Sequence, residues 1–216
     1  MPKTIDEKLK EGREYRRINL EDIELREGET EDEKYIVEGY ATKFSNWYTL
    51  YKYGRYTVLE SIDPHAFDKC DMSDVIMQYD HEGRVFARTT NATLTLIIDK
   101  IGLKIRAYLG GTEGGRQLFE EIKGKYISKM SFGFVVSTQE RKVVEDEEND
   151  TETVYRTITG ISKLYDVSAV SIPANDATEI SSRTLGEGVI AEALQELEQA
   201  KKREEQRKKL RIMCAM

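Results

Sequence analysis

The sequence is poor in cysteine and histidine, and this limits the disulfides, metal sites and catalytic bases that it can form. The two cysteines, Cys70 and Cys214, lie far apart and form no metal-type spacing. A disulfide scaffold is therefore not indicated, and a reducing compartment fits. The two histidines are His65 and His81, so any reaction that needs an imidazole base must use one of them.

Long apolar runs are also missing. No stretch approaches the ~20 apolar residues that cross a bilayer. The N-terminal sequence MPKTIDEKLKEGREYRR has no apolar segment of the kind found in secretory signals. The sequence predicts a soluble cytosolic protein without a membrane partner.

Positive charge is in deficit, with 33 basic against 40 acidic residues and a net charge of −7. Such a chain is not steered towards nucleic acid by its overall field, so nucleic acid is not an expected partner. The sequence also lacks a phosphate-binding loop, a dinucleotide glycine pattern and a metal-ligand cluster. We expect no cofactor and no metal site.

The chain is rich in short segments that alternate between apolar and polar residues, as β-strands do. Residues 94–96, 103–109 and 127–138 show this pattern, and residues 18–25, 35–42, 154–158 and 161–172 are further predicted strands. Turn residues between 99 and 102 predict an antiparallel hairpin. We expect a mainly antiparallel β fold, barrel-like, with a few helices, in the α+β class.

Three further segments complete the expected organisation. A helix should begin after Thr112 and end at Gly124. Residues 46–55, which hold Trp47 and several tyrosines, should form a long aromatic loop. The acidic run EDEENDTE at residues 145–152 should be a solvated linker between two strands.

The composition changes near both ends of the chain. Residues 1–16 are charged and aperiodic, and we expect a flexible N-terminal arm there. Residues 17–184 would form the main domain. From Leu185 the spacing becomes helical and then charged on every face, which predicts a helical C-terminal tail over residues 185–216, outside the core.

A hydroxyl, an imidazole and a carboxylate occur on or at the ends of predicted strands, as in serine hydrolases. Ser131 should lie on the strand face opposite Met130 and Phe132, and Gly133 should leave open space beside its hydroxyl. His81 is the preferred base because it follows a strand and precedes a glycine. Asp166 is the candidate orienting acid.

Less specific interpretations stay open for each of these residues. A strand-end histidine is often an ordinary surface residue, and Asp166 could be a charged residue on a strand edge. Lys129 stands where an α/β-hydrolase elbow needs glycine, so the Gly-x-Ser-x-Gly interpretation fails. Asp63, Asp80 and Glu82 are competing carboxylates nearer to His81 in sequence.

Five segments together resemble the prohead (capsid maturation) protease family of tailed phages, which is similar in fold to the herpesvirus assemblin proteases. They are residues 38–44 (EGYATKF), 62–67 (IDPHAF), 77–81 (MQYDH), 129–134 (KMSFGF) and 164–175 (LYDVSAVSIPAN). Two positions depart from the family pattern. His65 replaces a usual glycine, and Asp166 replaces a usual glutamate.

The resemblance implies that His81 is the base, Ser131 the nucleophile and Asp166 the orienting acid. By analogy with assemblin, the backbone amides of Ala174 and Asn175 would form the oxyanion hole, since Pro173 has no N–H. It also implies a herpesvirus-protease-like fold.

The implied function is that of a serine endopeptidase in phage capsid maturation. Its substrates would be the scaffold protein, scaffolding segments of the major capsid protein, and itself. The site of action would be the procapsid in the host cytoplasm, and a homo-oligomer is expected. The alternatives are a non-catalytic capsid-assembly module of the same fold and a serine esterase.

Overall fold

A computed structural model of the chain describes residues 5–19, 24–26, 34–170 and 176–214. The fold is mainly β, with 51% of residues in strands and three helices, in agreement with the expected α+β class. The chain divides into two compact units. The first contains residues 1–46, 62–139 and 158–181, and the second contains residues 47–61, 140–157 and 182–216.

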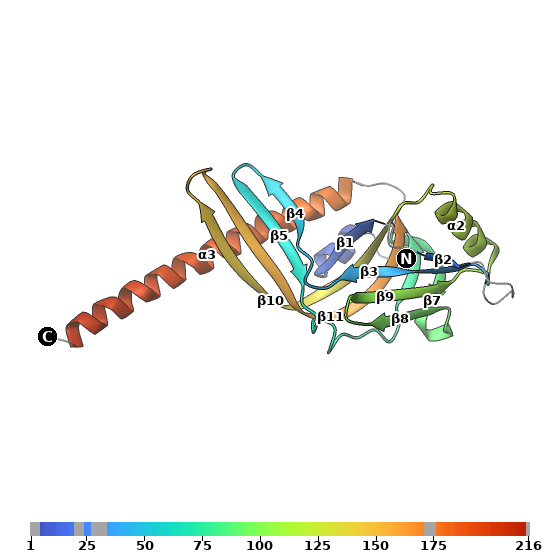
Figure 1. Cartoon of the computed structure of the whole chain (residues 1–216), viewed down its shortest axis with the longest axis horizontal. Helices are drawn as coiled ribbons and strands as arrows, with labels where there is room; N and C mark the ends of the chain where they lie inside the picture. Colours follow the sequence, from blue (N-terminus) through green and yellow to red (C-terminus); the bar gives the residue numbers. More distant parts are fainter. Residues whose placement is uncertain (1–4, 20–23, 27–33, 171–175, 215–216) are drawn as a thin grey trace. The chain divides into compact units, whose positions relative to one another are not determined.

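The first unit contains a four-stranded sheet in the order β2-β3-β9-β8 (Figure 1). Its strands are β2 (Glu24–Arg26), β3 (Ile36–Lys43), β8 (Leu94–Ile98) and β9 (Gly102–Tyr108). Asp99 shapes the β8–β9 turn, because its carboxylate accepts hydrogen bonds from the amides of Ile101 and Gly102. The predicted hairpin is confirmed.

Helix α2 (Glu113–Lys123) confirms the predicted start and end of the helix. Thr112 caps its N-terminus, since its hydroxyl accepts a hydrogen bond from the Gly115 amide at 3.0 Å. Leu118, Phe119 and Ile122 are buried on one side of the helix. A short 3₁₀ turn, η2 (Thr89–Asn91), precedes β8.

The remaining strands of the first unit belong to the sheet that contains two long strands, β10 (Lys129–Asp146) and β11 (Thr151–Val170). Strand β1 (Arg13–Asn19) runs antiparallel to β10. Strand β6 (Ile76–Tyr79) runs parallel to β11, and β7 (Glu82–Arg88) returns antiparallel to β6. A short helix, α1 (Ile5–Lys10), precedes β1, so the expected flexible arm contains regular structure.

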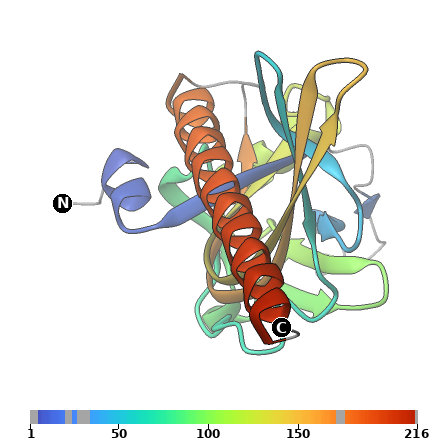
Figure 2. The same ribbon diagram turned by 90° about the vertical axis from the view of Figure 1, so that its left-hand side faces the viewer.

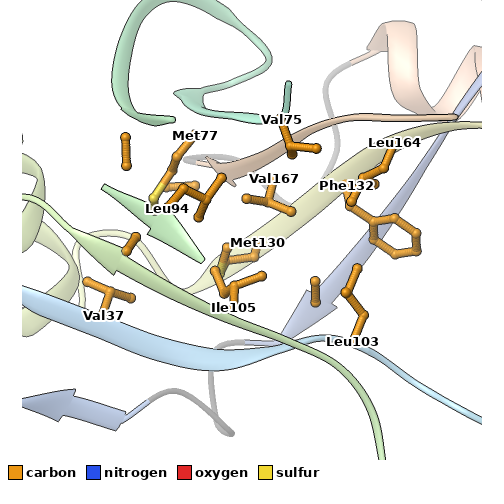
Figure 3. Packing of buried hydrophobic residues seen from close by; sticks show 14 of the residues in the cluster. Val37, Val75, Met77, Leu94, Leu103, Ile105, Met130, Phe132, Leu164 and Val167 are labelled. Carbon is orange, nitrogen blue, oxygen red and sulfur yellow. The ribbon is translucent and has the colours of Figure 1, made fainter. Parts of the chain in front are cut away.

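The core of the first unit is one continuous apolar cluster. Figure 3 shows its packing around Met77, Ile105, Met130, Phe132 and Val167. These side chains come from β6, β9, β10 and β11. The core therefore fixes the strand of Ser131, the strand of Asp166 and the strand that leads to His81.

The second unit is built from β4 (Tyr48–Tyr53), β5 (Tyr56–Ile62), the distal parts of β10 and β11, and α3 (Asp176–Cys214) from residue 182 onward. The prediction of an aromatic loop at residues 46–55 is wrong, because residues 48–53 form β4 and pair with β5. Aromatic residues are also frequent in β-strands, and here they form a strand rather than a loop. The acidic run at residues 145–152 contains the connection between β10 and β11, as expected.

Helix α3 is a single unbroken helix (Figure 2). Its side chains at Val189, Ile190 and Ala193 are buried against Val58 and Val154. The expectation that residues after Leu185 lie outside the core is therefore wrong for the first turns of that stretch. Residues 201–208 are exposed, in agreement with their charge.

The second unit also buries an ion pair. The Arg156 guanidinium donates a hydrogen bond to Glu60, and both residues are fully buried. The Tyr48 hydroxyl donates to the same carboxylate. None of the helices in the described ranges is both long enough and apolar enough to cross a membrane.

Candidate active site

His81 lies in the two-residue turn that joins β6 to β7. Tyr79 and Glu82 are paired across this turn, and Asp80 and His81 form its tip with φ values of 47° and 60°. Positive φ at both central residues is what a type I′ hairpin turn requires. Asp and His adopt this region more readily than most non-glycine residues, and such strained positions occur often in active sites.

The turn is held against β11. The Asp80 amide donates a hydrogen bond to the Ala169 carbonyl at 2.9 Å, which extends the β6–β11 pairing by one residue. This pairing brings the turn to the strand that carries Asp166. His81 is 7% exposed, so it is not an ordinary surface residue.

The structure brings His81 and Asp166 together. Their atoms Nδ1 and Oδ1 are 2.5 Å apart, although the residues are 85 positions apart in sequence. A carboxylate can only accept, so the Nδ1 atom of His81 carries the proton and donates it. With Nδ1 used in this hydrogen bond, Nε2 is the ring atom left to exchange a proton with another group.

A second hydrogen bond holds the same carboxylate. The Ser168 hydroxyl, which is fully buried, donates to Oδ1 of Asp166 at 2.8 Å. Ser168 and Asp166 are two residues apart on β11, so both side chains lie on the same face. The Ser168 hydroxyl thus holds Asp166 in its orientation independently of the imidazole.

Gly133 makes the carboxylate position possible. A Cβ at this residue would lie 2.6 Å from Oδ2 of Asp166 and 2.7 Å from Cε1 of Tyr15. The expected open space beside the Ser131 hydroxyl is therefore occupied. In this strand the glycine makes room for the acid and the tyrosine, and Ser131 lies two residues away on the same face.

Tyr15 of β1 forms one wall of the site. Its ring centroid is 4.4 Å from that of His81, with 58° between the planes. Tyr15 is the partner of Gly133 in the β1–β10 register. Burial, and then the negative charge of Asp166, raise the pKa of Tyr15 above its usual range, so its hydroxyl stays protonated.

The candidate nucleophile is enclosed. Ser131 is 2% exposed, and its hydroxyl makes no hydrogen bond within the ranges that the structure describes. A peptide carbonyl cannot approach the oxygen in this arrangement. The candidate nucleophile is therefore buried, whereas His81 and Asp166 are already paired.

The other candidates from the sequence have separate roles or places. His65 lies on an exposed turn, where its Nδ1 is 3.2 Å from Asp68. Asp63 accepts a hydrogen bond from the His65 amide at 2.8 Å, as a turn cap does. The proposed oxyanion residues Ala174 and Asn175 lie outside the described residues.

Two residues of the site were missed by sequence reasoning. Ser168 could have been found, because a hydroxyl two positions after Asp166 on a strand must share its face. Tyr15 had no such signal, since its place depends on pairing between β1 and a distant strand. No group of three or more metal-ligating side chains occurs among the residues described.

A buried histidine–aspartate pair, with a serine on the adjoining strand two residues from the glycine that lies beside the aspartate, defines a candidate serine hydrolase. A family model described as caudovirus prohead serine protease matches residues 21–192 of the 216. The chain belongs to this family of serine proteases that act in phage capsid maturation. No curated protein and no solved structure matches the chain significantly.

Proposed function

We propose that this protein is a serine endopeptidase in which Ser131 is the nucleophile, His81 the general base and Asp166 the orienting acid. The hydrogen bond from His81 to the buried, prearranged Asp166 carboxylate carries the proposal. An ordinary surface histidine would be exposed to solvent, whereas His81 is buried beside a carboxylate. Membership of the prohead protease family supports a serine endopeptidase.

The chemistry follows from this arrangement. Nε2 of His81 takes the hydroxyl proton while Oγ of Ser131 attacks the peptide carbonyl, and Asp166 stabilises the imidazolium that results. The imidazolium then gives its proton to the departing amine, which leaves an acyl-enzyme. A water molecule, deprotonated by His81, hydrolyses the acyl-enzyme and restores the serine. The backbone amides of Ala174 and Asn175 are proposed to stabilise the oxyanion.

The proposed substrates are the scaffold protein or scaffolding segments of the major capsid protein, together with the protease itself. Cleavage would occur inside the procapsid in the host cytoplasm, with the protease present as a homo-oligomer. Family membership supports a capsid or scaffold substrate. Removal of such segments would free internal space and make assembly irreversible.

The test is co-expression with a candidate capsid protein, followed by mass spectrometry of both chains. We expect defined cleavage products with the native chain and none with Ser131→Ala, because loss of a triad nucleophile lowers the rate by up to ~10⁶. His65→Ala is the matched control and should leave cleavage intact. Retained cleavage in a pure Ser131→Ala preparation would refute the assignment.

One observation favours a second candidate function, a non-catalytic assembly module of the same fold. The Ser131 hydroxyl is enclosed and unbonded within the described ranges, as an incidental serine would be. A labelled fluorophosphonate separates the two functions, since only an activated serine reacts with it. Stoichiometric labelling that Ser131→Ala abolishes supports the protease.

A further inference from the structure

We propose that the N-terminal segment made of α1 and β1 blocks the active site of its own chain, so that the intact chain is a self-inhibited form. This inference rests on the proposed function, because it takes Ser131 and His81 as the reacting groups. It concerns residues 5–19, all of which precede the part of the chain that the family model matches.

The first observation is the register of β1 on the nucleophile strand. Strand β1 pairs antiparallel with residues 129–135 of β10, and Arg17 is the direct partner of Ser131. Proteases commonly take a peptide as an added strand beside the catalytic residues, held by main-chain hydrogen bonds. β1 already uses the main-chain groups of β10 on this side of Ser131.

The second observation is that β1 and α1 both contact the base. The Tyr15 ring packs on the His81 ring and over Gly133. The Lys8 ammonium donates a hydrogen bond to the main-chain carbonyl of His81 at 2.8 Å. The segment therefore reaches the strand of the nucleophile and the turn of the base at once.

A third contact anchors the strand beside the acid. The Arg13 guanidinium lies 3.5 Å from the ring centroid of Tyr165, the residue before Asp166. Cation–π contacts of this kind contribute about 0.5–2 kcal/mol, depending on burial. Together the anchors keep the segment in place by several modest interactions, each of which a single substitution can remove.

The enclosure of Ser131 distinguishes a segment that blocks the site from one that only positions His81. A segment that only positioned His81 would leave the nucleophile reachable and in contact with its base. Here the Ser131 side chain is 2% exposed and its hydroxyl makes no hydrogen bond in the described part of the chain. Removal of the segment should thus expose the hydroxyl and free the adjoining edge of β10 for an extended peptide.

The test places a recognition site for an unrelated sequence-specific protease after residue 21 of the full chain. The chain folds intact and is then cut, so that the segment is held only by its contacts. In the uncut chain, the covalent link keeps the segment at an effective concentration of order mM beside the site. After the cut, the concentration of the segment is that of the protein itself. We expect fluorophosphonate labelling of Ser131 in dilute, cut protein to become at least ~tenfold faster, since the reactive fraction of molecules rises.

Two further measurements make the result specific. A synthetic peptide of residues 5–19 added to the cut protein should restore slow labelling, and the same peptide with Tyr15→Ala should inhibit less. In the uncut chain, Tyr15→Ala should speed labelling, whereas Tyr126→Ala, at a side chain that is 82% exposed, should not. Circular dichroism of each variant confirms that the fold persists.

The outcomes are distinct. If the uncut and cut chains label at the same rate, or if cutting slows labelling, the segment does not block the site and this inference is wrong while the proposed function stands. If Ser131 labels in neither form although both are folded, the proposed function fails, and the inference fails with it.

Discussion

At the scale of single residues, two groups of the candidate site, His81 and Asp166, are oriented by hydrogen bonds. Asp166 receives hydrogen bonds from His81 and Ser168, and its second oxygen lies over Gly133. Family resemblance alone gave its role at the sequence level, because the 85-residue separation from His81 leaves no local signal. Asp80 and Glu82 flank His81 directly in the sequence, but the carboxylate that the imidazole binds is that of Asp166.

Asp166→Asn should lower the cleavage rate by up to ~10⁴, because an amide that donates to Nδ1 favours the wrong imidazole tautomer. Substrate affinity should change little. Asp166→Glu should keep partial activity, since it retains the carboxylate that the family pattern has at this position. Steady-state kinetics on a peptide substrate gives both values. Near-normal turnover in Asp166→Asn would show that another group orients His81.

Cys70 provides a prediction about pH. The pKa of its thiol is raised to about 11, mainly because the thiol is buried. The thiolate is the reactive form, so at pH 8 only ~10⁻³ of the thiol is reactive. In a Cys214→Ser background, iodoacetamide should alkylate Cys70 slowly at pH 8, and the rate should rise about tenfold per pH unit up to pH ~11. The urea-unfolded chain is the control, and equal rates in folded and unfolded chains would contradict the burial.

At the scale of elements, the fold was predictable where the determinants are local. Thr112 and Gly124 mark the ends of α2, and Asp99 shapes the turn between β8 and β9, so sequence spacing was sufficient. The partner of β1 was not predictable, because pairing with β10 depends on contacts between distant segments. Strand β4 was missed because its aromatic residues suit both strands and binding loops.

Gly133→Ala tests the packing between β10, β11 and β1. The added methyl group would meet Oδ2 of Asp166 and the Tyr15 ring, so one of them must move. Movement of the carboxylate would misorient His81, and a misplacement of about 1 Å can lower a rate by ~10²-fold. We expect activity to fall far more than thermal stability, measured by peptide cleavage and calorimetry. Gly114→Ala is the control, since the nearest atoms there are 3.6 Å away.

At the scale of the whole molecule, α3 contains two stretches with different roles. Its side chains at Val189, Ile190 and Ala193 complete the apolar cluster of the second unit. Residues 201–208 are exposed and pair mainly along the helix, as Glu204 does with Lys208 at 2.8 Å. Exposed pairs of this kind contribute only ~0.3–0.5 kcal/mol each.

Truncation within α3 should therefore have unequal effects. A chain that ends at residue 202 should keep the melting temperature of the full chain within a few degrees. A chain that ends at residue 184 loses several buried aliphatic side chains, each of which contributes about 1.5–3 kcal/mol, and should lose the cooperative unfolding of the second unit. Differential scanning calorimetry compares the two. Equal melting of both truncated chains would contradict the burial described.

The parallel pairing of β6 with β11 also sets the order of events during synthesis. Asp166 pairs with Ile76 and Ala169 with Tyr79, so the strand that carries Asp166 is made long after His81. A chain emerging from the ribosome at ~5–20 residues per second carries His81 and Ser131 before Asp166 is available. If Asp166 has the proposed role, a nascent chain cannot assemble the His81–Asp166 pair until translation has passed β11.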